Sequence, residues 1–359
     1  MFLAVVVFVL IFGLIVLVHE LGHFYFAKRA GIKVEEFGFG LPPRLWGIKK
    51  GETIYSLNWI PFGGFVRMLG ENEAVNSHRA FSSKSAGQRI LVVVAGVMMN
   101  FGLGFVLMML GFWLAMPPFV TPPEQYVANP SQITSQVVVV GVIEGSPAEA
   151  AGLQSGDYLL GAGATTFTTT DDFKEFTNAN GAQAFTVRVQ RDNEAMELRL
   201  TPTLGEAGFE VGAWIDRSVQ SVHYVWWQVP WLALQETARL LWVVLVAIAG
   251  FIYQLFTKAS VSSDLAGPVG IAKITADLLS LGWLRIVQFT IFLSINLGII
   301  NLVPFPALDG GRLLFIIIEL LRGGRKVPQR IEGAIHGLGF VLIMLLILVV
   351  TYRDVIKLL

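Results

Sequence analysis

Long apolar runs alternate with polar stretches along the chain, and this pattern predicts several membrane-spanning helices. Four runs have few charged residues over about 20 positions or more, the length that a helix needs to cross a bilayer. A shorter helix, Gly311–Leu321, is expected after Pro304 and Pro306 end the third run. The predicted spans are Phe2–Ala27, Ile90–Met116, Leu284–Val303 and Ile331–Thr351.

The polar stretches between these runs differ in character. Glycine and proline punctuate residues 30–89, and Thr53–Leu57 and Gly64–Met68 are candidate short strands of a membrane-associated β-hairpin region. Residues 137–216 are strand-rich and typical of a soluble α+β domain. The pattern divides the chain into an N-terminal membrane part (1–116), a proline-rich linker (117–136), an inserted domain (137–216), a connecting region (217–283) and a C-terminal membrane part (284–359).

Basic residues predict how the spans are oriented, because they gather on the cytoplasmic side of a membrane. Residues 28–89 hold ten Lys or Arg, and residues 312–330 hold five. Residues 117–229 also hold five, but spread over more than a hundred positions and beside thirteen acidic residues. We therefore expect the two short basic regions inside the cell and the inserted domain outside.

This orientation constrains a fifth apolar run, Trp231–Phe256. The second predicted span ends outside the cell, and the third must start outside to reach the basic region 312–330. The fifth run can therefore cross the membrane only an even number of times, and a single span does not fit. Glu236 and Arg239 lie near its start, and tryptophans precede it, as at a membrane interface. An interfacial amphipathic helix is the preferred interpretation, and a re-entrant hairpin is the alternative.

Composition supports a membrane protein and narrows its chemistry. Hydrophobic residues make up 54% of the chain, charged residues 14%, and the mean hydropathy is +0.64. The formal net charge is zero, which implies no general attraction to nucleic acid. Because the chain has no cysteine, disulfides and thiolate–zinc sites are excluded, and a zinc ion would need histidine and carboxylate ligands.

The candidate chemistry begins with His19-Glu20-Leu21-Gly22-His23 at the end of the first apolar run. Positions i and i+4 share one face of a helix, so both imidazoles can bind one metal, and Glu20 can act as general base. A packed core histidine and a secretory signal peptide are the alternatives. Two histidines and a glutamate in an apolar helix disfavour a packed core histidine, since ionisable groups at membrane depth are usually functional. A signal peptide is disfavoured because no basic residue precedes the apolar run and no cleavage site of small residues follows it.

A catalytic zinc site usually has three protein ligands, and Asp309 is the best third candidate. It follows two prolines and precedes two glycines in Asn301–Gly311, a pattern that predicts irregular backbone at membrane depth. The alternative is an aspartate that only caps a helix. His336 is expected to make a packing or hydrogen-bond contact. His19 lies roughly 25 Å along its helix, near the cytoplasmic side of a core about 30 Å thick.

The two motifs together resemble the site-2 protease family of intramembrane zinc metalloproteases, in its bacterial RseP-type branch. The resemblance also covers Pro61–Val66, Ala95–Asn100 and Gly267–Ile271. It implies that Zn²⁺ is the cofactor, bound by His19, His23 and Asp309, with Glu20 as general base. It further implies that Asn301, and also Asn296, contact the substrate backbone or the developing oxyanion.

An extended substrate could be held as an added β-strand. The strands with Tyr55 and Phe65 are the candidates to offer that edge, and a plain cytoplasmic hairpin is the alternative.

A second resemblance lies in the inserted domain. Gly145–Asp157 is similar to the SPAxxAGLxxGD signature of bacterial PDZ domains, which bind peptides by strand addition. It implies that Val211, Gly212 and Ala213 belong to a site for peptide C-termini. Relatives in many bacteria carry two such domains, whereas this chain has room for one.

Together these patterns predict an α-helical polytopic protein of the bacterial cytoplasmic membrane, with four spans, an external PDZ domain and a zinc site towards the cytoplasm. The expected activity is cleavage of single-span membrane proteins in or near their spans, after a first external cut by another protease. The main rival is an inactive PDZ-bearing scaffold or chaperone, which would not need Glu20. A transporter is disfavoured because the chain lacks repeated halves.

Overall fold

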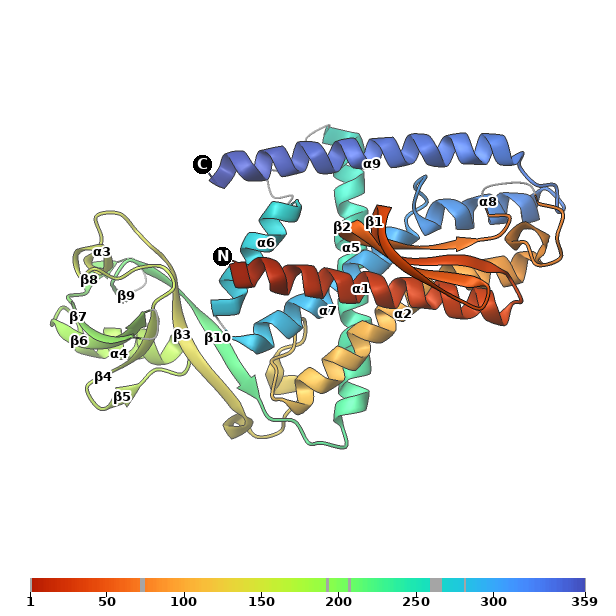
Figure 1. Ribbon diagram of the computed structural model, residues 1–359. Coiled ribbons are helices and arrows are strands. Elements are labelled where there is room, and N and C mark those ends of the chain that lie inside the picture. The colour runs from red at the N-terminus through yellow and green to blue at the C-terminus, as the bar shows by residue number, and fades with distance from the viewer. Residues whose placement is uncertain are drawn as a thin grey trace. The chain divides into compact units, whose positions relative to one another are not determined.

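The computed structural model describes residues 2–71, 75–191, 194–205, 208–258, 267–280 and 282–358, so part of the predicted connecting region lies outside the described residues. The chain forms two compact units (Figure 1). The first consists of residues 1–111 and 233–359 and holds most of the long helices and a β-sheet. The second consists of residues 112–232 and is built mainly of strands.

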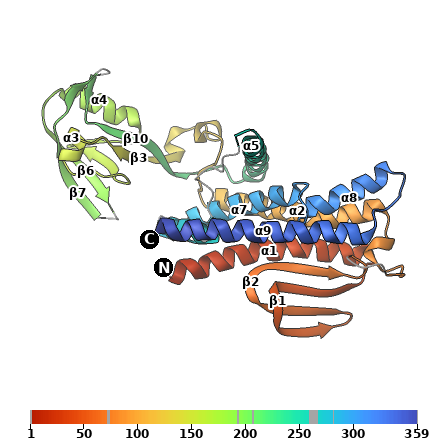
Figure 2. The ribbon, with the colours of Figure 1, turned by 90° about the horizontal axis from the view of Figure 1, so that it is seen from above.

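The long apolar runs form helices, and α1, α2, α7 and α9 extend in a similar direction (Figures 1 and 2). Small residues bring these helices close together, as is usual where lipid removes the hydrophobic drive for helix association. A Cβ on Gly22 of α1 would lie 2.5 Å from the Ala95 carbonyl oxygen of α2. The helices are α1 (Phe2–Arg29), α2 (Ala86–Trp113), α5 (Val229–Lys258), α6 (Pro268–Ser280), α7 (Trp283–Leu302), α8 (Asp309–Leu321) and α9 (Gln329–Leu358).

The four predicted spans coincide with α1, α2, α7 and α9, with shifted ends. Helix α2 begins and ends about one turn earlier than predicted, and α9 continues to Leu358. Within the described part of the chain, five helices are long and apolar enough to cross a membrane by length and composition. They contain Leu3–Arg29, Ala86–Trp113, Val229–Phe251, Trp283–Leu302 and Arg330–Ile356.

Helix α5 corrects one of the two interpretations of the fifth apolar run. Residues 229–258 form one uninterrupted helix, so the re-entrant hairpin is wrong. The physical reason is that this run contains no proline and only one glycine, which gives the backbone no place to reverse. Helix α5 runs across the direction of α1, α7 and α9, and Figure 2 shows it end-on.

The polar segment after α1 forms a sheet of two long bent strands, β1 (Val34–Lys50) and β2 (Thr53–Met68). The sequence predicted only the two ends of β2. Because both strands bend, Phe37 pairs with both Tyr55 and Val66, and Tyr55 also pairs with Ile48. The order across the sheet is therefore 64–68, 34–39, 53–60 and 44–50, with 64–68 at one edge. Phe37 and Tyr55 pack against Phe24 of α1, which attaches the sheet to the helix.

The second unit contains an antiparallel sheet in the order β10-β3-β4-β6-β7, with β5 paired to β4. Its core is apolar, and buried Asp157 accepts two hydrogen bonds from Arg191. The predicted limits 137–216 are too narrow, because β3 begins at Ile133 and β10 ends at Val222. The remaining elements are β4 (Tyr158–Ala162), β5 (Thr165–Thr166), β6 (Phe185–Arg191), β7 (Glu194–Leu200), β8 (Thr203–Gly205), β9 (Gly208–Glu210), α3 (Pro147–Ala150) and α4 (Thr170–Asn180).

Helix α4 starts with a capping box that makes the second unit sensitive to acid. The Asp172 carboxylate accepts hydrogen bonds from Thr168 and from the Thr169 backbone, while the Thr169 hydroxyl accepts from the Asp172 N–H. Burial would raise the pKa of Asp172, but these hydrogen bonds outweigh it and lower the pKa to about 2. The carboxylate therefore stabilises α4 at neutral pH, and this contribution is lost as the pH falls from about 4 towards 2.

We predict that Asp172→Ala destabilises α4 by about 1 kcal/mol at pH 7. The penalty should shrink below pH 4, where the wild-type carboxylate itself becomes protonated. Hydrogen exchange of the amides of residues 170–180, measured by mass spectrometry at several pH values, checks this. Asp171→Ala is the matched control, because Asp171 is acidic and in the same first turn but is exposed. Equal exchange in the two variants at pH 7 would contradict the prediction.

Candidate metal centre

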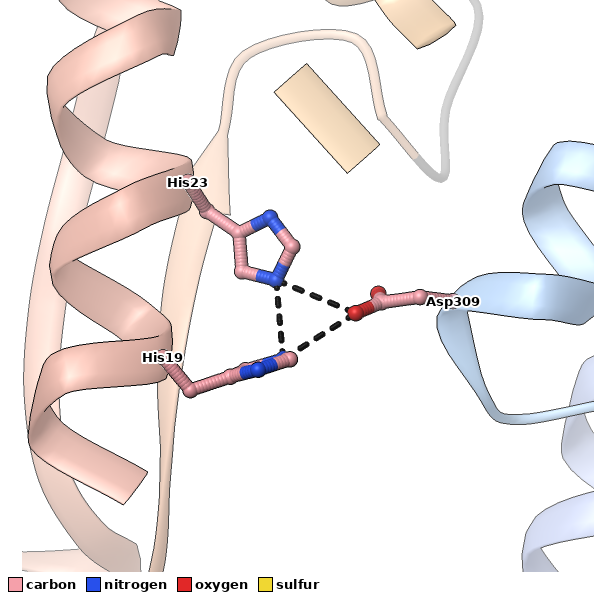
Figure 3. A group of neighbouring side chains, drawn as sticks. All are labelled: His19, His23 and Asp309. Carbon is pink, nitrogen blue, oxygen red and sulfur yellow. Dashed lines mark hydrogen bonds and ion pairs between the residues drawn. The ribbon is translucent and has the colours of Figure 1, made fainter. Parts of the chain in front are cut away.

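Three side chains from opposite ends of the chain converge at one point (Figure 3). His19 and His23 extend from one face of α1, and Asp309 extends from the first turn of α8. The His19 Nε2 atom lies 3.0 Å from His23 Nε2 and 3.0 Å from Asp309 Oδ2. The His23 Nε2 atom lies 3.2 Å from the same carboxylate oxygen. Both imidazoles are buried.

This triangle fits a zinc ion. Zinc–nitrogen and zinc–oxygen bonds of about 2.0–2.2 Å with tetrahedral angles place neighbouring ligand atoms ~3.3 Å apart. The observed separations of 3.0 to 3.2 Å are close to that value. Two neutral imidazoles and one carboxylate also match the ligands that catalytic zinc sites use, which leaves a fourth position for water or substrate.

Hydrogen bonds behind the histidines orient them for metal binding. His23 Nδ1 donates to the Val92 carbonyl oxygen at 2.8 Å, which leaves Nε2 with the free lone pair. Asn100 is fully buried, and its Nδ2 atom lies 3.4 Å from His19 Nδ1. Its Oδ1 atom has no hydrogen-bond partner among the described residues. Exchanging the amide oxygen and nitrogen lets Oδ1 accept from His19 Nδ1–H, which frees His19 Nε2 for the metal.

A glycine lets α2 approach the two histidines. A Cβ on Gly96 would lie 2.4 Å from His23 Nε2 and 2.8 Å from the His19 Cε1 atom. Such distances are below van der Waals contact, so any larger residue at this position displaces the ligand atoms. Because Val92 and Asn100 are each one helical turn from Gly96, one face of α2 supports both imidazoles.

The loop between α7 and α8 places Asp309 opposite the histidines. Pro304 and Pro306 prevent α7 from continuing, and α8 begins at Asp309 itself, two residues earlier than predicted. A Cβ on Gly310 would lie 2.2 Å from the Val303 carbonyl oxygen, and one on Gly311 would lie 2.5 Å from the Phe305 carbonyl oxygen. The two glycines therefore allow the loop to fold tightly onto the start of α8.

The three candidate ligand residues line a cavity of about 560 Å³, which we call the metal cavity. Glu20 lines it too and is half-buried. The edge segment of β2 forms part of its wall, and a Cβ on Gly64 would lie only 3.0 Å from Glu20 Cγ. Arg312 reaches the cavity from one turn after Asp309, and its guanidinium donates to the Glu71 carboxylate.

The structure brings some of the remaining predicted residues to this cavity and leaves others away from it. Asn301 lines the cavity, with its Nδ2 atom 3.4 Å from His19 Nε2, and Phe65 lines it from the β2 edge. Asn296 donates to the Phe292 carbonyl oxygen of its own helix and is not among the described lining residues. Tyr55 lies on an inner segment of the sheet, so it cannot offer a free strand edge.

The predicted peptide-binding residues belong to the second unit. Val211 is buried, and its carbonyl oxygen accepts from the Ala148 N–H. The Gly212 carbonyl oxygen accepts from the Ile143 N–H, and Ala213 begins β10. Among the described residues β10 pairs only with β3, so it lies at an edge of the sheet.

Sequence reasoning missed Asn100, Gly96 and Arg312 as parts of the site. Gly96 and Asn100 stand four positions apart on a predicted span, a spacing that places them on one helix face. Arg312 follows Asp309 by three positions, which places these two residues on one helix face as well. The sequence alone does not show whether these helix faces point towards the metal ligands or away from them.

Comparison with known proteins agrees with the geometry. The model of the family described as "Peptidase family M50" matches residues 7–346. A protein of Clostridium perfringens is 34% identical over 354 residues, which are 97% of each chain. The zinc metalloprotease RasP of Oceanobacillus iheyensis is 30% identical and the regulator of sigma-W protease RasP of Bacillus subtilis 29%, each covering 98% of both chains.

Among solved structures, the PDZ domain of an SdrC-like protein from Listeria innocua matches 25% of this chain and 99% of that chain. It is 19% identical, with a TM-score of 0.21.

We predict that Gly96→Ala weakens metal binding, because the added methyl group overlaps the His23 ligand atom; overpacking of this kind typically costs about 1–3 kcal/mol. Gly102→Ala on the same helix is the matched control, since a Cβ there meets nothing within 4 Å. Zinc content and zinc affinity of the two purified variants, measured by elemental mass spectrometry and chelator competition, check this. Similar zinc affinity in both variants would show that α2 does not restrain the imidazoles as described.

Proposed function

The chain belongs to peptidase family M50 and is a zinc metalloprotease of the membrane, and we propose that it hydrolyses single-span membrane proteins in or near their spans. The observation that carries this proposal is the convergence of His19, His23 and Asp309 beside Glu20 in one cavity among apolar helices. An inactive scaffold is disfavoured, because it would need neither the general base nor ligands held this closely.

In the proposed reaction, the chain's residues hold the metal and move one proton. Bound zinc supplies a water of lowered pKa and polarises the scissile carbonyl group. The Glu20 carboxylate accepts the proton of the attacking water and then donates it to the leaving amine as the peptide C–N bond breaks. One water is consumed, and one carboxylate and one amine are produced. The Asn301 amide, which lies beside the metal ligands, donates a hydrogen bond to the carbonyl oxygen as its negative charge develops.

We propose that the substrate binds in extended form along the 64–68 edge of β2. A helical substrate satisfies its own backbone hydrogen bonds, so a span must unwind locally before a peptide bond reaches the ligands. An added strand would replace the lost bonds. The position of this edge supports the idea, because Gly63–Met68 line the metal cavity and Gly64 lies against Glu20. Phe65, and not Tyr55, is then the side chain that contacts the substrate.

The proposed orientation places the β1–β2 sheet in the cytoplasm and the second unit outside, with four spans and α5 at the outer interface. The excess of basic residues in 28–89 and 312–330 supports it. Exposed Trp226 and Trp227, just before α5, and Trp231 in its first turn are typical of an interfacial position. The direction of α5 across the other long helices also favours a helix that lies along the membrane (Figure 2).

We propose that the second unit is a PDZ domain that binds peptide C-termini and restricts access of uncut substrates. The signature Gly145–Asp157 and the edge position of β10 support this. Ser146 caps α3, and its hydroxyl donates to the Gly212 carbonyl oxygen, which ties the signature to the predicted binding segment. Peptide titration, and cleavage of substrates with and without a bulky external domain, test these two roles.

We predict that Glu20→Gln lowers cleavage at least about 100-fold, because general base catalysis is lost. Zinc should remain bound, since all three ligands survive. Turnover of a model membrane substrate and zinc content of the same preparation give the two readings. Asp309→Ala is the counterpart and should lose both activity and zinc. Wild-type turnover in the Glu20→Gln variant would rule out the assigned base.

We also predict the sides of the membrane on which single introduced cysteines react. The chain has no cysteine, so a membrane-impermeant thiol reagent has a clean background. The cysteine of Asn180→Cys should react with reagent added outside intact cells. The cysteines of Gly51→Cys and Gly324→Cys should react only after the membrane is opened. Cysteines at Gln228 and Gln254, near the two ends of α5, should both react from outside. Labelling of Gln254→Cys only in opened membranes would make α5 a fifth span and contradict the proposed count.

A further inference from the structure

The loop that carries Asp309 satisfies all but one of its backbone donors by itself. Between Val303 and Leu308 the two prolines have no N–H, which leaves four donors. Val303 donates to the Ile300 carbonyl oxygen, Phe305 to Val303 and Leu308 to Phe305. The remaining donor, the N–H of Ala307, points out of the loop. Buried backbone donors are nearly always paired, so this group needs an acceptor from elsewhere.

His336 of α9 is that acceptor. Its Nδ1 atom lies 2.9 Å from the Ala307 nitrogen, so it makes the hydrogen bond that the sequence predicted for this histidine. Because Nδ1 accepts, the neutral ring carries its proton on Nε2. Nε2 is buried and has no hydrogen-bond partner among the described residues. His336 also lines a second cavity of about 100 Å³ with Arg312, Glu319 and Glu332, which has polar groups enough to hold water.

The backbone at Ala307 has an unfavourable conformation next to this contact. Ala307 has φ of +77°, a left-handed conformation that residues other than glycine rarely adopt without support from their surroundings. Helix α9 lies directly against the same loop, because a Cβ on Gly339 would be 2.4 Å from the Pro306 carbonyl oxygen. His336 and Gly339 are three positions apart and so share one face of α9. One face of the last helix therefore contacts the loop at two successive residues, 306 and 307.

We propose that His336 is a positioning residue for the metal ligand Asp309. By accepting the Ala307 N–H, it holds the loop in the one conformation that directs the Asp309 carboxylate to His19 and His23. The proposal rests on the proposed metal centre. It assigns to α9, which carries no metal ligand, a direct part in keeping that centre assembled.

His336 is not a fourth protein ligand in this arrangement. Its Nδ1 atom is engaged by Ala307, and its ring lines the second cavity and not the metal cavity. Its effect on the metal is transmitted by two peptide units of the loop. Groups that orient metal ligands in this way typically change metal affinity about 10- to 100-fold when they are removed.

Three substitutions separate the hydrogen bond from the size of the side chain. His336→Leu fills similar space but accepts no hydrogen bond. His336→Asn is smaller, but its Oδ1 atom can occupy the place of Nδ1 and accept from Ala307. His336→Gln is also polar and is one methylene longer than asparagine, so its amide oxygen reaches the place of Nε2 and not that of Nδ1. We expect His336→Leu and His336→Gln to bind zinc about 10- to 100-fold more weakly, and His336→Asn to stay near the wild type.

Zinc affinity is measured on the full-length protein in detergent by competition with chelators of graded strength. Hydrogen exchange at Ala307 is followed in parallel and should be faster in the Leu and Gln variants only. Glu332→Gln is the matched control, because Glu332 lines the same second cavity one turn earlier on α9, and it should leave zinc affinity unchanged.

Wild-type zinc affinity in His336→Leu, or equal weakening in His336→Asn and His336→Leu, would overturn the proposal. If the Leu variant does not fold, the Asn and Gln variants make the same comparison, and equal affinities in those two would overturn it as well. Asp309→Ala separates this outcome from failure of the metal centre itself. Unchanged zinc affinity in Asp309→Ala would refute Asp309 as a ligand. If Asp309→Ala loses zinc affinity while His336→Leu keeps it, only the role of His336 is refuted.

Discussion

The metal centre depends on how closely backbones approach one another around it. Helices in lipid gain little from hiding apolar side chains, so contact between small residues has to hold them together. At Gly22 and Gly96 the backbones of α1 and α2 come so near that a single methyl group would overlap a carbonyl oxygen or a ligand nitrogen. This contact fixes the imidazoles on the side of α2 that carries Val92 and Asn100. Every other part of the site, including the loop with Asp309 and the edge of β2, is built against that fixed pair.

The two imidazoles of the candidate metal centre are supported by groups from another helix, which orient them towards a common point. The Val92 carbonyl oxygen and Asn100 support the two imidazoles from α2. Asp309 is 290 residues from His19 in sequence, so its position cannot come from local structure and has to be set by the packing of α7, α8 and α9. Preorganisation of this kind matters more in a membrane, where a misplaced ionisable group has no water to solvate it.

The sequence singled out the candidate ligands because their chemistry is unusual for their surroundings. His19, Glu20 and His23 interrupt an apolar helix, and Asp309 stands among prolines and glycines that no packed helix needs. The sheet was less predictable. Val34–Lys50 was missed because glycines and two adjacent prolines break its alternating pattern, and Tyr55 proved to be on an inner segment because the strands bend and pair twice. Strand pairing and helix rotation are long-range properties, so Asn296 could be named from sequence but not located.

The proposed binding of substrate along the β2 edge has a consequence for how a helical substrate would be cut. An enzyme with only the metal and its base would have to attack a backbone whose carbonyl groups are already hydrogen-bonded within a helix. In the proposed binding mode, a strand edge next to Glu20 would offer alternative partners at the point where the helix must open, so that unwinding and correct placement of the peptide bond would occur together. Gly63 and Gly64 suit this place, because without side chains they let the substrate backbone come near the carboxylate. The same edge would bind spans that contain helix-destabilising residues more readily, since less hydrogen bonding has to be exchanged. Selectivity among membrane segments can therefore arise from how easily each span unwinds, in addition to any side-chain contact with Phe65.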